Sequence, residues 1–217
     1  MQRYNLRQKT ESYLGNLSDL EQFANLGKQY IFKVGVNEKL ASAWVKVISA
    51  EAEVIKWTAE SRKRATIKDI LEKNKPDDKK YIATYSLWSE AGDLAAVSWY
   101  QIWEPGAEEL DKITTFCEAE RINNPIILTS AFRVAADFRK QGLAKKMVTL
   151  TELSYSSYLS QKLDASVNII FTLETDQNNE AAVHTYESNG YQIIGEFDQP
   201  DKEPYRGKRL LMVKRHK

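Results

Sequence analysis

Residues 139–144, Arg-Lys-Gln-Gly-Leu-Ala, place two basic side chains and a glycine between an apolar stretch and a segment of helical periodicity. The first N–H groups of a helix have no partner within the helix, and the aligned peptide dipoles favour an anion at that end. Gly142 lets a bulky anion approach the backbone, because glycine has no Cβ. The pattern indicates an anion-binding turn, although a basic turn before a helix is also common as an ordinary solvated helix start.

Thiol and imidazole chemistry is limited in this chain. Cys117 is the only cysteine, so the chain can form neither an internal disulfide nor a cluster of thiolate metal ligands. His184 and His216 are the only histidines, which disfavours a multi-histidine metal site within one chain. We therefore expect no metal.

The charge balance and the N-terminal sequence bear on partners and location. Lys and Arg total 31 against 30 Asp and Glu, a net charge of +1, which is not the footprint of a nucleic-acid binder. Residues 1–12 contain no apolar core of signal-peptide type, and no segment reaches membrane-spanning length. We expect no nucleic-acid partner, no membrane span and a cytoplasmic location.

The segments before this turn show two periodicities. Residues 4–7 suggest a short strand, and residues 18–74 are predicted to be mainly helical, with apolar side chains at helical spacing that include Ala41, Trp44, Val45 and Ile48. Residues 81–88 and 94–103 are rich in β-branched and aromatic side chains around a polar, glycine-containing link. This second pattern predicts a β-hairpin.

The remaining elements alternate strand and helix. Residues 107–121 are predicted to be helical or irregular. Strands are predicted at residues 126–134, 167–173, 191–197 and 210–214, and helices at residues 141–159 and 178–188. The order favours an α+β fold with a mixed sheet, organised as one domain over residues 1–217.

Residues 126–197 resemble the GNAT superfamily of acyl-CoA-dependent N-acyltransferases. The family's R/Q-x-x-G-x-G/A turn is matched by Arg139, Gly142 and Ala144. In the family's upstream V-x-P-x-x-R pattern, Val134 and Arg139 match, whereas Ala136 replaces the usual proline. The replacement lowers the rigidity of the turn but removes no chemical group.

A second family motif, N-x-x-A-x-x-x-Y-x-x-x-G-F, follows after a strand. It is matched by Asn179, Ala182, Tyr186 and Gly190, with Tyr191 in place of phenylalanine. The order of elements extends the resemblance to roughly residues 81–214, and residues 1–80 match only in outline. The resemblance implies a mostly antiparallel mixed sheet flanked by helices. In this fold, residues 18–80 would form an extended helical region on the acceptor side, and residues 126–197 the acyl-CoA-binding core.

The resemblance also implies acetyl-CoA as cosubstrate. The N–H groups of the turn would hold the coenzyme A pyrophosphate, with positive charge from two basic side chains. The pantetheine arm would lie along the preceding strand as an added strand does, and a separation of that strand from residues 167–173 would admit the thioester. The implied binding residues are Phe132, Arg133, Val134, Arg139, Lys140, Gln141, Gly142, Leu143, Ala144 and Asn179. Asn179 is equally consistent with a helix cap.

For catalysis, the resemblance implies that Tyr186 is a general acid and that a backbone N–H near Val134 stabilises the oxyanion. A phenol with an ordinary pKa of about 10 suits protonation of a thiolate. Tyr186 is also consistent with a plain core aromatic. His184 should point to another face of the same helix, where a solvent-exposed position is favoured over a catalytic base.

The general base is not identified by the sequence. Glu118, Glu120 and Glu174 are candidates through proximity along the chain, and a water chain to solvent is an alternative. An acyl-cysteine on Cys117 is disfavoured, because no histidine lies near it in sequence to activate the thiol.

The first functional hypothesis is direct transfer of an acetyl group from acetyl-CoA to a primary amine of a small molecule or peptide. A second is transfer of a longer acyl group from acyl-CoA or an acyl carrier protein. For that activity, aromatic side chains would line an acyl tunnel instead of forming plain core: Trp88, Trp99, Tyr100 and Trp103. A third is a non-catalytic acyl-CoA-binding module. A homodimer is left open.

Overall fold

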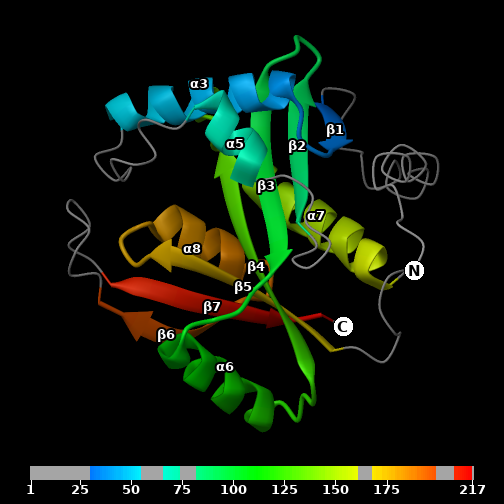
Figure 1. Ribbon diagram of the computed structural model, residues 1–217. Coiled ribbons are helices and arrows are strands. Elements are labelled where there is room, and N and C mark those ends of the chain that lie inside the picture. The colour runs from blue at the N-terminus through cyan, green and yellow to red at the C-terminus, as the bar shows by residue number, and fades with distance from the viewer. Residues whose placement is uncertain (1–29, 55–65, 74–81, 161–167, 199–207, 217) are drawn as a thin grey trace.

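The computed structural model describes residues 30–54, 66–73, 82–160, 168–198 and 208–216 (Figure 1). The elements are β1 (Tyr30–Val34), α3 (Glu38–Val54), α5 (Ile67–Lys73), β2 (Ala83–Ser89), β3 (Leu94–Ile102), α6 (Ala107–Ala119), β4 (Pro125–Val134), the 3-10 helix η2 (Ala136–Phe138), α7 (Leu143–Ser160), β5 (Asn168–Asp176), α8 (Glu180–Glu187), β6 (Gln192–Phe197) and β7 (Arg209–Arg215). The strand predicted at residues 4–7 lies outside the described residues.

The strands form one 7-stranded sheet in the order β1-β2-β3-β4-β5-β7-β6. Every neighbouring pair is antiparallel except β4 and β5, which are parallel. The connection between these two strands contains α7, as a parallel pair requires. The expectation of a mixed, mostly antiparallel sheet flanked by helices is confirmed.

The strand β1 was not predicted: it lies within residues 18–74, which were expected to be mainly helical and which also contain α3 and α5. Its five residues alternate between partly buried and exposed positions and pair with β2. Ile31 is exposed while Phe32 packs on the core, which is the period of a strand at the edge of a sheet. Gly35, at φ +92°, follows the strand in a conformation that glycine adopts without strain.

The two faces of the sheet are covered by different helices. On one face, α7 packs on β2, β3 and β4, and the apolar residues of α8 join the same core. Four side chains of α7 at helical spacing are buried: Leu143, Met147, Leu150 and Ser154. On the opposite face, Trp44 and Ile48 of α3 pack against Trp88 and Val97, with α5 beside α3.

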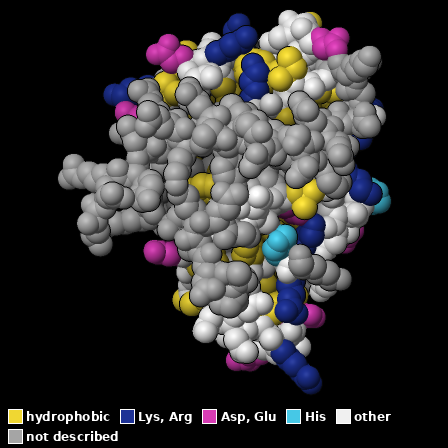
Figure 2. Space-filling model, turned by 90° about the vertical axis from the view of Figure 1, so that its right-hand side faces the viewer, with side chains coloured by type: hydrophobic (Ala, Val, Ile, Leu, Met, Phe, Trp, Pro, Cys, Tyr) yellow, Lys and Arg dark blue, Asp and Glu magenta, His cyan; other side chains and the backbone are white. Residues whose placement is uncertain are grey.

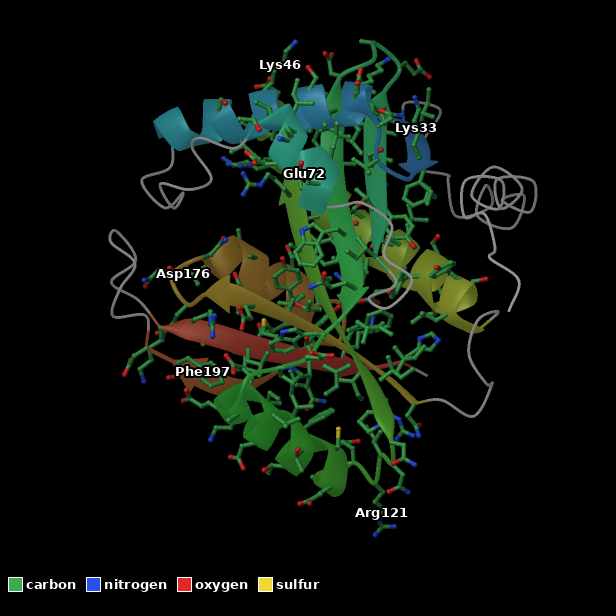
Figure 3. All side chains as sticks on the ribbon, viewed as in Figure 1. Lys33, Lys46, Glu72, Arg121, Asp176 and Phe197 are labelled. Carbon is green, nitrogen blue, oxygen red and sulfur yellow. The ribbon has the colours of Figure 1, made fainter. Side chains whose placement is uncertain are left out.

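Helix α6 covers β5, β7 and β6 on the same face of the sheet as α3. Ile113 and Cys117 of α6 pack against Ile170, Val213 and Phe197. Figure 3 labels Phe197 beside α6. The segment expected to be helical or irregular is therefore a helix, and its apolar side closes a separate small core.

The predicted separation of the two parallel strands is present. The strands β4 and β5 pair from Pro125 and Asn168 up to Ser130 and Leu173. Beyond this point β4 continues to Val134 beside β3 only, and β5 continues to Asp176 beside β7 only. The carboxyl ends of the parallel strands thus diverge, which is where open sheets commonly accept ligands.

Surface charge is mixed on the side of the molecule turned to the viewer in Figure 2. Among the described residues seen there, basic and acidic side chains are interspersed. None of the helices in the described part of the chain combines the length and the apolar character needed to cross a bilayer.

Candidate active site

The turn between β4 and α7 has the conformation of an anion-binding loop. Lys140 and Gly142 have φ angles of +60° and +73°, which reverse the backbone on either side of Gln141. Within the described ranges, the N–H groups of residues 140–144 donate to no protein acceptor. A Cβ added to Gly142 would meet no described atom within 4 Å. The turn therefore offers several backbone donors beside open space, at the positive end of α7.

Side chains hold this turn from both sides. Arg139 Nε donates to the carbonyl oxygen of Val134 at 3.2 Å, and Gln141 Nε2 donates to the carbonyl oxygen of Asp137 at 3.3 Å. Tyr30 Oη, on the edge strand β1, donates to Gln141 Oε1 at 2.9 Å. The basic side chain of Arg139 thus lies at the junction of β4 and the turn.

The strand that leads into the turn brings three predicted binding residues to the diverging end of β4. Phe132, Arg133 and Val134 pair with β3 and lie beyond the last residue of β4 that pairs with β5. Phe132 and Val134 pack on the core under α7, so the alternation of the strand directs Arg133 to the opposite face. The main chain of this segment has one strand neighbour, and its other side faces the space between β4 and β5.

Tyr186 lies on α8 beside this same strand end. Its ring centroid is 6.0 Å from that of Phe132 and 5.8 Å from that of Tyr191. The side chain is largely buried, and its hydroxyl makes no hydrogen bond to another residue in the described part of the chain. Burial raises the pKa of the phenol above its ordinary value, so Tyr186 is protonated at neutral pH.

Tyr191 replaces the phenylalanine that is usual in the second motif, and its additional hydroxyl forms a hydrogen bond. Tyr191 Oη donates to Glu152 Oε1 at 2.7 Å, and Lys214 Nζ donates to Glu152 Oε2 at 2.5 Å. Burial raises the pKa of the Glu152 carboxyl, and the hydrogen bonds from Lys214 and Tyr191 oppose that rise. The network ties α7 to β7 and to Tyr191, the residue before β6, whose ring lies next to that of Tyr186.

Sequence reasoning missed Glu152 and Tyr30, since no local pattern marks either residue. A glutamate inside a helix is ordinarily exposed, and only the tertiary fold places Lys214 opposite Glu152. The one feature of the sequence that pointed to such a partner was Tyr191, which carries a hydroxyl group where the second motif usually has phenylalanine.

Asn179 forms the helix cap that the sequence left open as one of its two roles. Its Oδ1 accepts from the N–H of Ala182 at 3.3 Å at the start of α8. His184 is exposed on α8, as expected.

The candidate bases differ in their position. Glu118 and Glu120 precede the first residue of β4, whereas the strands diverge beyond Ser130, about 17 Å further along the strand. Glu174 lies on β5 just beyond the divergence, where it forms an ion pair with Arg209 at 3.0 Å. Of the three carboxylates, only Glu174 is close to the diverging strand ends.

Cys117 is unsuited to covalent catalysis. It is buried in the core between α6 and the sheet, and burial raises the pKa of its thiol, which disfavours the nucleophilic thiolate. The expectation against an acyl-cysteine agrees with this position.

Known proteins resemble the chain in sequence profile and in fold. Residues 57–191, more than half of the chain, match the profile described as Acetyltransferase (GNAT) family. The structure is similar to the acetyltransferase of the GNAT family from Streptococcus pneumoniae, with 15% identity, a TM-score of 0.60, and 87% of this chain and 99% of that chain covered. No curated protein sequence matches the chain.

Two further structures of similar fold contain coenzyme A or acetyl-CoA. One is AAC(6')-Ib in complex with ribostamycin and coenzyme A, at 17% identity and TM-score 0.59, with 87% of this chain and 94% of that chain covered. The other is yncA, a putative acetyltransferase from Salmonella typhimurium with its cofactor acetyl-CoA, at 10% identity and TM-score 0.59, with 85% and 93% covered.

Proposed function

Because this chain belongs to the acetyltransferase (GNAT) family, and is thus an acyltransferase, we propose that it transfers an acetyl group from acetyl-CoA to a primary amine. One observation carries the proposal. The β4–α7 turn presents backbone N–H groups that have no described protein acceptor, directly after a parallel strand that diverges from its neighbour. This arrangement suits an extended thioester with a pyrophosphate at one end.

The turn is proposed to bind the pyrophosphate of acetyl-CoA. The donors would be the N–H groups of Lys140, Gln141, Gly142, Leu143 and Ala144, with charge from the exposed side chains of Arg139 and Lys140. The open space beside Gly142 supports the fit. Asn179 Oδ1 already accepts from a backbone N–H, so a further contact of Asn179 with the cosubstrate would use its amide nitrogen.

The pantetheine arm is proposed to lie along Phe132, Arg133 and Val134, in the space where β4 and β5 diverge. Its amides would bond to the strand main chain as an added strand does. The length of the divergent segment supports this placement, because β4 extends four residues beyond Ser130.

Acetyl-CoA supplies an activated acetyl thioester, and residues near the strand end are proposed to assist its transfer. The amine nitrogen forms the new bond to the acetyl carbon, and the carbon–sulfur bond breaks. A backbone N–H near Val134 would stabilise the negative charge on the carbonyl oxygen. Tyr186 would donate its proton to the departing sulfur, because the phenol is protonated at neutral pH and lies beside the strand end; the burial that raises its pKa also makes it a weaker acid than an ordinary phenol.

The proton released by the amine needs an acceptor. Glu174 is the one sequence candidate near the divergence, but its carboxylate is already engaged in an ion pair with Arg209 at 3.0 Å. We therefore propose that water carries this proton to solvent. The acceptor amine would approach from the face of α3 and α5, within the region of residues 18–80 assigned to the acceptor side.

The packing of the aromatic residues argues against a long acyl tunnel. Trp88 and Trp99 pack with α3 on one face, Tyr100 packs under α7 on the other, and Trp103 joins the core of α6. Because the four side chains belong to three different cores, they do not line one channel.

The test is incubation of the protein with isotopically labelled acetyl-CoA and a pool of amines, amino acids and peptides, followed by mass spectrometry. We expect an acetylated amine and stoichiometric free coenzyme A. Acetyl-, octanoyl- and palmitoyl-CoA compared with the identified amine should give the highest kcat/KM with acetyl-CoA. Tight acetyl-CoA binding without product across the pool would instead indicate a non-catalytic binding module.

A further inference from the structure

The edge strand β1 contacts the proposed pyrophosphate turn across a large separation in sequence. Tyr30 Oη donates to Gln141 Oε1 at 2.9 Å, although the two residues are 111 positions apart. The ring of Tyr30 also packs edge-on against Phe138 of η2, with centroids 6.2 Å apart. One tyrosine thus contacts both the 3-10 helix and the apex of the turn.

Gln141 is held through both ends of its amide group. Its Oε1 accepts from Tyr30, and its Nε2 donates to the carbonyl oxygen of Asp137 at 3.3 Å. Gln141 stands between Lys140 and Gly142, the two residues with positive φ. The hydrogen bonds therefore fix the residue about which the backbone reverses.

An anion-binding turn works best when its N–H groups already point at the ligand, because ordering them on binding lowers the affinity. Positive φ at Lys140 is unfavourable for a residue with a Cβ, so the turn needs support from outside. Among the described side chains, Tyr30 supplies that support from β1, together with the internal bonds of the turn.

We infer that Tyr30 is a positioning residue for the cosubstrate: through Gln141 it holds the turn in the conformation that binds the pyrophosphate of acetyl-CoA. The inference rests on the proposed function. It assigns to β1 a role in the affinity for acetyl-CoA, although this strand lies three strands away from β4 in the sheet.

The test compares the binding of two acyl donors, acetyl-CoA and S-acetylpantetheine, to Tyr30→Phe and to the wild-type protein. Phenylalanine keeps the ring contact with Phe138 and removes only the O–H group. We expect the Kd for acetyl-CoA, measured by calorimetry, to rise about fivefold, the loss of one net hydrogen bond. The Kd for S-acetylpantetheine, which has no phosphate, should stay within about twofold, because it does not contact the turn.

A double-mutant cycle locates the effect. Gln141→Leu removes both hydrogen bonds of the amide and should raise the Kd for acetyl-CoA at least as much as Tyr30→Phe, and the double variant should bind no more weakly than Gln141→Leu alone. Tyr100→Phe is the matched control: its phenol hydrogen-bonds to Thr151 of α7 at 2.9 Å, away from the turn, so the Kd for acetyl-CoA should not change.

Two results would overturn the inference: an unchanged Kd for acetyl-CoA in Tyr30→Phe, or an equal loss for both donors, which would indicate general damage to the fold. The proposed function has a separate readout in the wild-type protein. If that protein bound acetyl-CoA no more tightly than S-acetylpantetheine, the pyrophosphate site itself would be wrong, and the role of Tyr30 would fail with it.

Discussion

The β4–α7 turn and the cluster around Tyr186 are two halves of one proposed site, built in opposite ways. The turn uses backbone N–H groups from consecutive residues, and its shape depends on Gly142. The cluster uses side chains from separate elements: Tyr186 of α8, Phe132 of β4, and Tyr191 with its bond to Glu152 of α7.

This difference implies different sensitivities to substitution. In the turn, most side chains can change without loss of the donors, because each non-proline residue supplies an N–H group. In the cluster, each side chain carries its own chemistry, and removal of Glu152 or Tyr191 leaves a hydrogen-bonding group without its partner. Ligand binding at the turn should therefore be lost through changes in backbone conformation, whereas activity at the cluster should be lost through removal of single functional groups.

The largest effect is expected at Gly142. Gly142→Trp should abolish detectable acetyl-CoA binding, because the indole would fill the open space beside the N–H donors. Gly92→Trp is the matched control, since Gly92 also has a positive φ, of +89°, and open space around it, but lies in the β2–β3 turn. Both variants should lose about 1–2 kcal/mol of stability from the left-handed backbone, measured by urea unfolding. Acetyl-CoA binding that survived in Gly142→Trp would refute the pyrophosphate assignment.

The next effect is expected in the cluster, at Tyr186. Tyr186→Phe keeps the ring contacts with Phe132 and Tyr191 and removes the proposed acid, so kcat should fall about 100-fold while KM for acetyl-CoA changes little. Because burial raises the pKa of Tyr186, ionisation of this phenol should not reduce the wild-type kcat between pH 7 and about pH 10. Tyr100→Phe, which also removes a buried phenol, should leave kcat unchanged. An undiminished kcat in Tyr186→Phe would assign the residue to the core alone.

The sequence predicted the turn better than it predicted the cluster, for a physical reason. A glycine turn before a helix is a local pattern, and the positive φ of Gly142 and the buried stripe on α7 follow from a few neighbouring residues. The hairpin of β2 and β3 was predicted in the same way, from alternation and a polar link. Each of these features depends on rules that operate within about one turn of helix or one pair of strands.

Contacts between residues far apart in the sequence could not be predicted from such local patterns. β1 has five residues, and its stability comes from pairing with β2 some fifty positions later. The bond between Tyr30 and Gln141 and the pair of Glu152 and Lys214 exist only once the sheet has formed. The second motif singled out Tyr186, but its contact with Phe132 had to come from the fold.

The smallest effect is expected at Glu152, the buried carboxylate that hydrogen-bonds to Tyr191 and Lys214 beside the cluster. Glu152→Leu removes the acceptor of both Tyr191 and Lys214, so the free energy of unfolding should fall by about 2 kcal/mol. Glu196→Leu is the control, because the Glu196–Lys208 pair at 2.8 Å is about half exposed and should change the free energy of unfolding by no more than about 0.5 kcal/mol.

The pH dependence of this difference has a definite sign. The pKa of Glu152 is raised in the folded protein, so the stabilisation from its protonated form is fully present below the unfolded pKa, about 4.3, and is lost as pH rises through the folded pKa. Wild type should therefore gain stability relative to Glu152→Leu as pH falls from 7 towards 4.5, measured by urea unfolding at each pH. A difference that shrank over this range would mean that the bonds from Lys214 and Tyr191 outweigh burial, and that the cluster rests on a stabilised ion pair.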